Sequence, residues 1–296
     1  MPVILVVAFI PIESRLKYIG LEEDCMNRGI WIYDRLYNNQ NPIDVAFIGS
    51  SKIINGINDG LINEQLGNKS IANFGYCRLG RNLHYTIIKE LLNSKNPSLL
   101  LLEVRETENR SGHEIFPFIA NSTDALLPYP FFNKHVARNT WTHLSYKVEL
   151  FQESIFETHK EVPISAENFS FVAATDTADA LELNQKKSNY KMNDFEKRFH
   201  YHYPLTYLRK IALLCKEQDV QLQLLFMPNY GTDMTSEVDF EPYSEFGTIL
   251  VPPKSILQNV NHWYDKAHLN EVGANQLSYW LSEEIAAIVT PKSNSL

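Results

Sequence analysis

Four short apolar runs with high β-propensity constrain the fold of this 296-residue chain more than any other feature. Each run is nearly continuous in its hydrophobicity instead of alternating, which is typical of strands that are buried on both faces of a parallel sheet. The runs are residues 43–50, 70–75, 97–104 and 220–228, and residues 246–252 form a weaker fifth run. The pattern therefore predicts a parallel β-sheet.

Amphipathic helical patterns lie between these runs. Residues 80–95 repeat apolar side chains at helical spacing, and residues 204–218 do the same. Pro204 suits the first turn of a helix, where no backbone N–H is required. A last helix is expected from about Asn270 to Val289. Alternation of strands and helices predicts an α/β fold, a three-layer α/β/α sandwich with right-handed crossovers.

Residues 106–193 interrupt the alternation, because they are first aromatic and Pro-containing and then polar and weakly patterned. We expect a mostly helical or irregular insertion that caps or borders the carboxyl edge of the sheet. It belongs to a domain that spans residues 41–296, preceded by an N-terminal segment of residues 1–40.

The N-terminal run PVILVVAFIPI is apolar over about eleven residues, whereas a membrane-spanning helix needs about 20. Two interpretations remain open. The run is either a buried strand or helical turn, or the tail of a membrane anchor or signal segment that begins upstream. We expect the protein in the cell envelope, periplasmic or membrane-anchored, with the cytoplasm as the alternative.

Composition narrows the classes of partner. Hydrophobic residues make up 44% of the chain and charged residues 21%, as in folded globular proteins. The net charge is −8 and no run of Lys and Arg is dense enough to follow a phosphate backbone, so nucleic acid is not an expected partner.

The cysteines and paired histidines do not suggest a metal site. Cys25, Cys77 and Cys215 are odd in number and scattered, which argues against a disulfide scaffold and against a Cys-x-x-Cys site. His200 and His202 are two residues apart, the wrong spacing for one helical face, and have no evident carboxylate partner. No metal or organic cofactor is expected.

Groups suited to nucleophilic catalysis occur at two distant places. In an open parallel sheet, ligands bind beyond the carboxyl ends of the strands. The first apolar run ends in Gly49, Ser50 and Ser51, and Asp265 precedes His268 by three residues just before the last helix. Each feature alone is an ordinary cap or turn. Together they predict a serine whose proton passes to an imidazole held by a carboxylate.

These features resemble the sequence blocks of SGNH (GDSL-type) hydrolases. Residues 49–51 resemble the Gly-Asp-Ser block of that family, with Ser50 in the place of Asp, and residues 265–268 resemble its Asp-x-x-His block. The second block is matched less closely by NFGYCRLG, residues 73–80. The resemblance covers about residues 42–290 without the insertion, and it implies a flavodoxin-like sandwich.

The resemblance also implies an activity, that of a serine esterase or O-acyltransferase. Ser51 is then the nucleophile, with Ser50 as the alternative, and His268 is the base that Asp265 orients. The backbone N–H groups of Ser51 and Gly75 are the implied oxyanion donors. The expected substrate is an acyl ester, in the first place an acetyl ester, of a carbohydrate or another small alcohol.

The third block departs from the family. SGNH hydrolases have Gly-x-Asn-Asp there, and the Asn donates to the oxyanion, but residues 102–109 read LEVRETEN. Arg105 either replaces that Asn as a charged donor or forms an ion pair with a nearby glutamate. The nearby glutamates are Glu103, Glu106 and Glu108. Such a variant block resembles envelope SGNH-like proteins that act beside polysaccharide O-acyltransferases, so a membrane-bound acyltransferase is an expected partner.

Four polar residues near the start of residues 80–95 are candidates for substrate binding. They are Arg78, Arg81, Asn82 and His84. Arginines beside a helix start suit an anionic or sugar ligand, but solvated helix-start residues in salt bridges are the more common explanation. The sequence leaves the oligomeric state open.

A second hypothesis assigns no catalysis to this fold. The missing Asn of the third block is compatible with a carbohydrate-binding or scaffold protein. A separation of Ser51 Oγ from the His268 ring beyond about 4–5 Å would favour that hypothesis.

Overall fold

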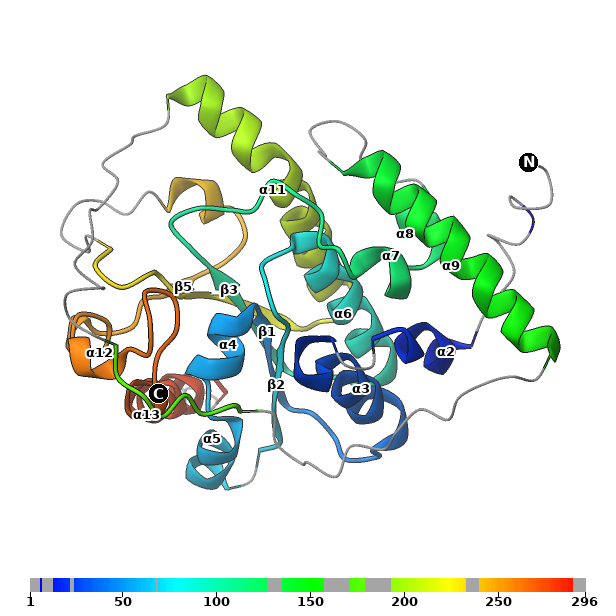
Figure 1. Ribbon diagram of the computed structural model, residues 1–296. Coiled ribbons are helices and arrows are strands. Elements are labelled where there is room, and N and C mark those ends of the chain that lie inside the picture. The colour runs from blue at the N-terminus through cyan, green and yellow to red at the C-terminus, as the bar shows by residue number, and fades with distance from the viewer. Residues whose placement is uncertain are drawn as a thin grey trace, which may run out of the picture.

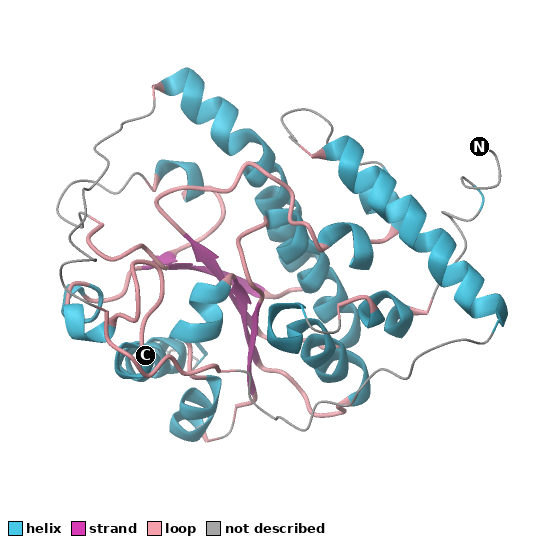
Figure 2. Ribbon diagram, in the orientation of Figure 1, coloured by secondary structure: helices cyan, strands magenta, loops and turns pink. Residues whose placement is uncertain are grey.

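A five-stranded parallel sheet forms the centre of the molecule (Figures 1 and 2). The computed structural model describes residues 6, 13–21, 24–67, 69–126, 135–156, 171–178, 193–232 and 240–289. The strands are β1 (Val45–Gly49), β2 (Ile71–Gly75), β3 (Leu99–Val104), β4 (Gln221–Phe226) and β5 (Ile249–Leu250). Each strand lies within one of the five predicted runs, so the parallel sheet is confirmed.

Helices cover both faces of this sheet (Figure 1). One face carries α4 (Ser51–Gly56), α5 (Asp59–Leu66), α12 (Lys254–Leu257) and α13 (Glu271–Val289). The other face carries α2 (Ser14–Ile19), α3 (Arg28–Tyr33), α6 (Arg81–Ser94) and α11 (Asp194–Glu217). Short helical turns complete these layers: η1 (Asp24–Asn27), η2 (Asp34–Asn38), η3 (Glu241–Tyr243) and η4 (Val260–His262). The three-layer α/β fold is confirmed.

The side chains of β3 explain why its sequence is uniformly apolar. Leu100 and Leu102 pack into the core on the α6 face, whereas Leu99 and Leu101 pack into the core on the α13 face. All four are fully buried. Burying one leucine contributes roughly 1.5–3 kcal/mol, so a strand enclosed on both sides gains from apolar residues at every position.

The strand order β2-β1-β3-β4-β5 determines where a ligand-binding crevice can form. The chain leaves β1 for β2 on one side and then returns past β1 to β3 on the other. In open α/β sheets a crevice forms beyond the carboxyl ends of the two strands where the order reverses. Here those ends belong to β1 and β3.

Helix α11 begins earlier than the sequence predicted. It starts at Asp194, and Pro204 lies in its interior and not in its first turn. Asn193 and Glu196 form a reciprocal capping box that stabilises the earlier start. Tyr203 and Tyr207 are buried on either side of the proline, and this packing offsets the backbone hydrogen bond that a proline cannot make.

The described parts of the insertion lie in two places. Helices α7 (Phe116–Ile119), α8 (Ser122–Leu126) and α9 (Val136–Phe156) pack together, with α7 also against α2 and α6. Residues 171–178 lie elsewhere, beside α4 and the start of α13. The described parts of the insertion therefore lie against two different regions of the sandwich.

Residues 13–21 and 24–38 pack as part of the sandwich. Tyr18, Trp31 and Ile32 are buried in the same core as the strands. Of the apolar run PVILVVAFIPI, all but Val6 lies outside the described residues. Among the described helices, none combines the length and hydropathy needed to cross a membrane.

A disulfide joins Cys25 to Cys77, which the sequence argument did not anticipate. The two cysteines are 52 residues apart, and the turn at Asp24–Asn27 brings them together beside the end of β2. Arg28 holds this turn in place by donating hydrogen bonds to the carbonyl groups of Asn73 and Gly75. The third cysteine is buried and free.

Candidate active site

The turn from β1 into α4 presents two serines at the carboxyl edge of the sheet. Ser50 is the N-cap of α4, and its Oγ accepts a hydrogen bond from Lys52 N at 3.2 Å. Ser51 is the first residue of the helix. A polar cap directly after a buried strand is what this local sequence favours.

Gly49 allows this turn to sit against β3. A Cβ atom at Gly49 would lie 2.3 Å from Ile53 Cγ1 and 2.4 Å from Glu103 Oε2. Neither neighbour has room to retreat, since both side chains are fully buried. The glycine is therefore required for Glu103 to reach the start of α4.

The turn ahead of α13 holds the imidazole. An antiparallel bridge between Trp263 and Leu269 closes a short loop. Within it, Asp265 Oδ1 accepts hydrogen bonds from Ala267 N at 2.6 Å and from His268 N at 2.8 Å. This turn folds the aspartate back toward the histidine three residues later.

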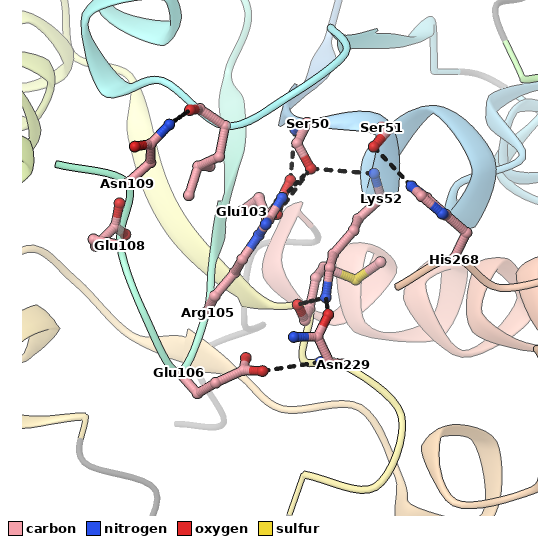
Figure 3. Close-up of polar contacts among 12 residues, drawn as sticks. Ser50, Ser51, Lys52, Glu103, Arg105, Glu106, Glu108, Asn109, Asn229 and His268 are labelled. Atoms are coloured by element: carbon pink, nitrogen blue, oxygen red, sulfur yellow. Dashed lines mark hydrogen bonds and ion pairs between the residues drawn. The ribbon is translucent and has the colours of Figure 1, made fainter. Parts of the chain in front are cut away.

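Ser51, His268 and Asp265 form a continuous hydrogen-bonded chain. Ser51 Oγ lies 2.8 Å from His268 Nε2 (Figure 3). His268 Nδ1 lies 2.8 Å from Asp265 Oδ2 and 3.0 Å from Oδ1. Because the carboxylate accepts from Nδ1, Nε2 is left to accept the serine proton. The serine–histidine distance is far inside the limit that would have favoured a non-catalytic protein.

The environment keeps Asp265 ionised. Burial alone would raise the pKa of Asp265, but hydrogen bonds from His268 and Ala267 outweigh it and lower that pKa. The aspartate side chain is 46% exposed and the histidine side chain 25% exposed, so the pair is open to solvent and to a ligand.

Ser50 is engaged by Glu103 and Arg105. Glu103 Oε2 accepts from Ser50 N at 2.6 Å, and Glu103 Oε1 accepts from Ser50 Oγ at 3.1 Å. Arg105 Nη2 donates to the same Oγ (Figure 3). Ser50 therefore donates its hydroxyl proton to Glu103, and its Oγ accepts hydrogen bonds from Lys52 N and Arg105 Nη2. Ser51 is the serine that contacts the imidazole.

Glu103 is buried and ionised. Burial alone would raise the pKa of Glu103, but the Arg105 guanidinium, the Ser50 N–H and the Lys52 ammonium hold that pKa at about 2. A buried carboxylate needs such partners to remain charged. Glu103 therefore anchors both the cap of α4 and the guanidinium.

Arg105 adopts one of the two arrangements that the sequence left open, the ion pair. Its Nε donates to Glu103 Oε1 at 2.5 Å, and its partner is neither Glu106 nor Glu108. The side chain stays at the site, 20% exposed, beside Ser50. Among the described residues its Nη1 has no hydrogen-bond partner, so the ion pair leaves that amino group, with its two N–H bonds, available.

Gly75 is not a free oxyanion donor. Its N–H donates to Asn73 Oδ1 at 3.0 Å within the end of β2. A Cβ atom at Gly75 would lie 2.9 Å from Ile54 N and 3.0 Å from Ser50 O. The glycine serves close packing of β2 against α4, and its N–H, predicted as an oxyanion donor, is engaged by Asn73 in this structure.

Lys52 is a polar residue of the site that the sequence argument missed. It is almost fully buried, and its Nζ donates to Met227 O at 3.0 Å and to Asn229 Oδ1 at 2.9 Å (Figure 3). Burial, helped by the positive charge of Arg105, lowers the pKa of Lys52 to about 8. The side chain ties the first turn of α4 to the end of β4. A lysine among apolar residues was the only local signal.

Three of the four predicted substrate-binding residues are interior. Arg81 is wholly buried in an ion pair with Glu108, and its Nη1 donates to the Glu103 carbonyl at 2.7 Å. Asn82 and His84 are fully buried in the same helix. Burial and the charge of Arg81 lower the pKa of His84 well below its usual value. These side chains support the β3 loop and do not face the crevice.

Arg78 is the exposed member of that group. It forms ion pairs with Asp24 and Glu114, and its side chain is 55% exposed. Its backbone has a φ of 67°, in a left-handed region that is uncommon for residues other than glycine. Arg78 follows the disulfide-bonded Cys77. Of the four, only Arg78 is open to a ligand.

The described residues hold no cluster of three or more His, Cys, Asp or Glu side chains suited to a metal ion.

Two solved structures are similar to this chain at low sequence identity. No protein-family model matches the sequence, and a comparison with curated proteins found no match. A structure described as a "putative acylhydrolase" from Bacteroides fragilis is similar with a TM-score of 0.43 and 10% identity, over 89% of this chain and 98% of that one. A structure described as a "putative platelet activating factor" from Streptococcus pneumonia is similar with a TM-score of 0.35 and 14% identity, over 90% and 94% of the two chains. Neither similarity assigns the chain to a family.

Proposed function

We propose that this protein is a serine-dependent ester hydrolase or O-acyltransferase of the SGNH type that works through an acyl-serine intermediate. One observation carries the proposal: Ser51 Oγ lies 2.8 Å from His268 Nε2, while Asp265 holds the other ring nitrogen. This is the arrangement that activates a hydroxyl as a nucleophile at neutral pH.

The proton and the acyl group move in two half-reactions. Ser51 Oγ attacks the ester carbonyl as its proton passes to His268 Nε2, and Asp265 stabilises the imidazolium. The tetrahedral adduct collapses, and the leaving alkoxide takes the proton from His268. A second hydroxyl, from water or from a sugar, then gives its proton to His268 and attacks the acyl-serine. The second tetrahedral adduct collapses, and Ser51 Oγ leaves as it takes the proton back from His268.

The developing oxyanion requires hydrogen-bond donors beside Ser51. The available donors are the backbone N–H of Ser51 and the guanidinium of Arg105, which Glu103 holds at the start of α4. Removal of one such donor typically costs about 3 kcal/mol of transition-state stabilisation.

The proposed substrate is an acyl ester of a carbohydrate or another small alcohol, with acetyl as the first acyl group to test. The proposed reaction needs no metal or organic cofactor. We place the protein in the cell envelope, beside a membrane-bound acyltransferase. The Cys25–Cys77 disulfide supports that location, because disulfides persist mainly in oxidising compartments.

Hydrolysis of p-nitrophenyl acetate and labelling by a fluorophosphonate test the proposal. We expect both with the wild-type protein, and we expect peptide mapping to place the label on Ser51. Ser51→Ala and His268→Ala should abolish both signals, whereas Ser94→Ala, a serine at the far end of α6, should leave them unchanged. Labelling that survives Ser51→Ala would overturn the assignment. A sugar added as acceptor distinguishes transfer from hydrolysis, because transfer produces an acetylated sugar.

A further inference from the structure

Residues 171–178 are hydrogen-bonded to the elements that carry both halves of the candidate active site, and we call this segment the strap. It has no regular secondary structure and appears in Figure 1 as a green tube beside α13. Its sequence, Phe-Val-Ala-Ala-Thr-Asp-Thr-Ala, carries no group that the proposed reaction uses. Its hydrogen bonds, however, lead to both sides of the site.

The first half of the strap binds the helix that carries the nucleophile. Asn55 Nδ2, in the last turn of α4, donates to Val172 O at 2.8 Å, and Val172 N donates to Ile54 O at 3.3 Å. Phe171 N donates to Asp59 Oδ1 at 3.2 Å at the start of α5. The strap is therefore attached to α4 one helical turn beyond Ser51.

The second half of the strap binds the neck of the loop that carries the base. Ala178 N donates to Trp263 O at 2.8 Å, where that loop begins. Where the loop ends, Glu271 N donates to Ala174 O at 2.8 Å and Asn270 Nδ2 donates to Thr177 Oγ1 at 3.3 Å. Asp265 and His268 lie between these attachment points.

We infer that the strap is a positioning element that sets the distance between Ser51 and His268 by binding α4 and the neck of the histidine loop at once. The two residues are 217 positions apart and meet through a single side-chain hydrogen bond. A misplacement of about 1 Å between reacting groups lowers the rate substantially. A segment hydrogen-bonded to both elements restrains that displacement. This inference rests on the proposed function.

Substitutions that break one attachment at a time test the strap. Asn55→Asp keeps the size of the side chain but sets an acceptor against Val172 O, and Thr177→Val removes the acceptor for Asn270. We expect kcat for p-nitrophenyl acetate, normalised to the folded fraction, to fall about fivefold to tenfold with KM within about twofold. Thr177→Ser should restore the wild-type value. Thr175→Val makes the same change at a second exposed threonine of the strap, which, unlike Thr177, accepts no hydrogen bond from Asn270, and it should have no effect.

A second measurement separates the strap from the proposed function. Hydrogen exchange of the amides of residues 263–271 should become faster in Asn55→Asp and Thr177→Val and stay unchanged in Thr175→Val. If Ser51→Ala still reacts with the fluorophosphonate, the proposed function fails, while hydrogen exchange still tests the attachment. If Ser51 is labelled, but at the wild-type rate in both strap variants, the positioning role is overturned and the proposed function stands.

Discussion

Replacing Glu103 by glutamine removes the negative charge beneath Ser50 with little change in shape. Glu103 is the acceptor for Ser50 N, Ser50 Oγ and Arg105 Nε. In Glu103→Gln, one carboxylate oxygen becomes an amide NH₂ group, which can no longer accept the hydrogen bonds that Ser50 and Arg105 donate. The guanidinium of Arg105 loses its counter-ion. We expect a less stable protein and a weaker active site.

The pKa of Glu103 sets the size of the effect on stability. A pKa lowered from 4.5 to about 2 in the folded state corresponds to about 3 kcal/mol of stabilisation at pH 7. Because the folded-state pKa lies below the unfolded one, this stabilisation is complete above pH 4.5 and is lost as the pH falls toward 2. Relative to Glu103→Gln, the wild-type advantage should shrink by about 1.5 kcal/mol between pH 7 and pH 3.5.

Urea unfolding of both proteins at the two pH values measures this advantage. The double difference cancels the titration of every other group, as long as the variant leaves their environments intact. Glu245→Gln is the matched control, because Glu245 pairs with Arg209 while both side chains are 52% exposed, and exposed pairs contribute about 0–1 kcal/mol. A wild-type advantage that does not change with pH would refute the reasoning, since it would mean that Glu103 is not held ionised by its partners.

Three further predictions concern Lys52, Arg105 and the disulfide. Because the folded-state pKa of Lys52 is about 8 against 10.5 in the unfolded chain, the unfolded state binds more protons between these values. Wild-type stability relative to Lys52→Met should therefore rise by about 2 kcal/mol from pH 7 to pH 10 in urea unfolding, and a fall would contradict it. Arg105→Gln should lower kcat about 100-fold with KM little changed if Arg105 binds the oxyanion. A rise in KM as large as the fall in kcat would argue against that role. Cys25→Ser should lower the free energy of unfolding by about 3 kcal/mol, and thiol titration of the unreduced wild type should find one free cysteine.

Local sequence was sufficient where a residue's partners are close in the chain or are nonspecific. Any apolar neighbour satisfies a buried leucine, so the β3 run predicted its strand without knowledge of what covers it. The Asp265 turn is closed by hydrogen bonds to residues two and three positions away, so the motif itself implied the paired carboxylate and imidazole. The prediction for Pro204 was wrong because its local preference for a first turn was outweighed by the cap at Asn193, eleven residues earlier, and by the buried tyrosines.

The amino-acid sequence alone determined the parallel sheet, the layers of helices and the identity of Ser51, Asp265 and His268 as a candidate set. Only the tertiary structure decided which donors those residues have around them. In the folded chain the Gly75 N–H donates to Asn73, and Arg105 donates to Glu103 and to Ser50. The physical reason is that hydrophobic burial is non-directional and can be read from a pattern. A hydrogen bond or ion pair instead depends on a specific partner within about 3 Å and on the orientation of both groups. The folded backbone sets that orientation even for residues two positions apart, such as Asn73 and Gly75.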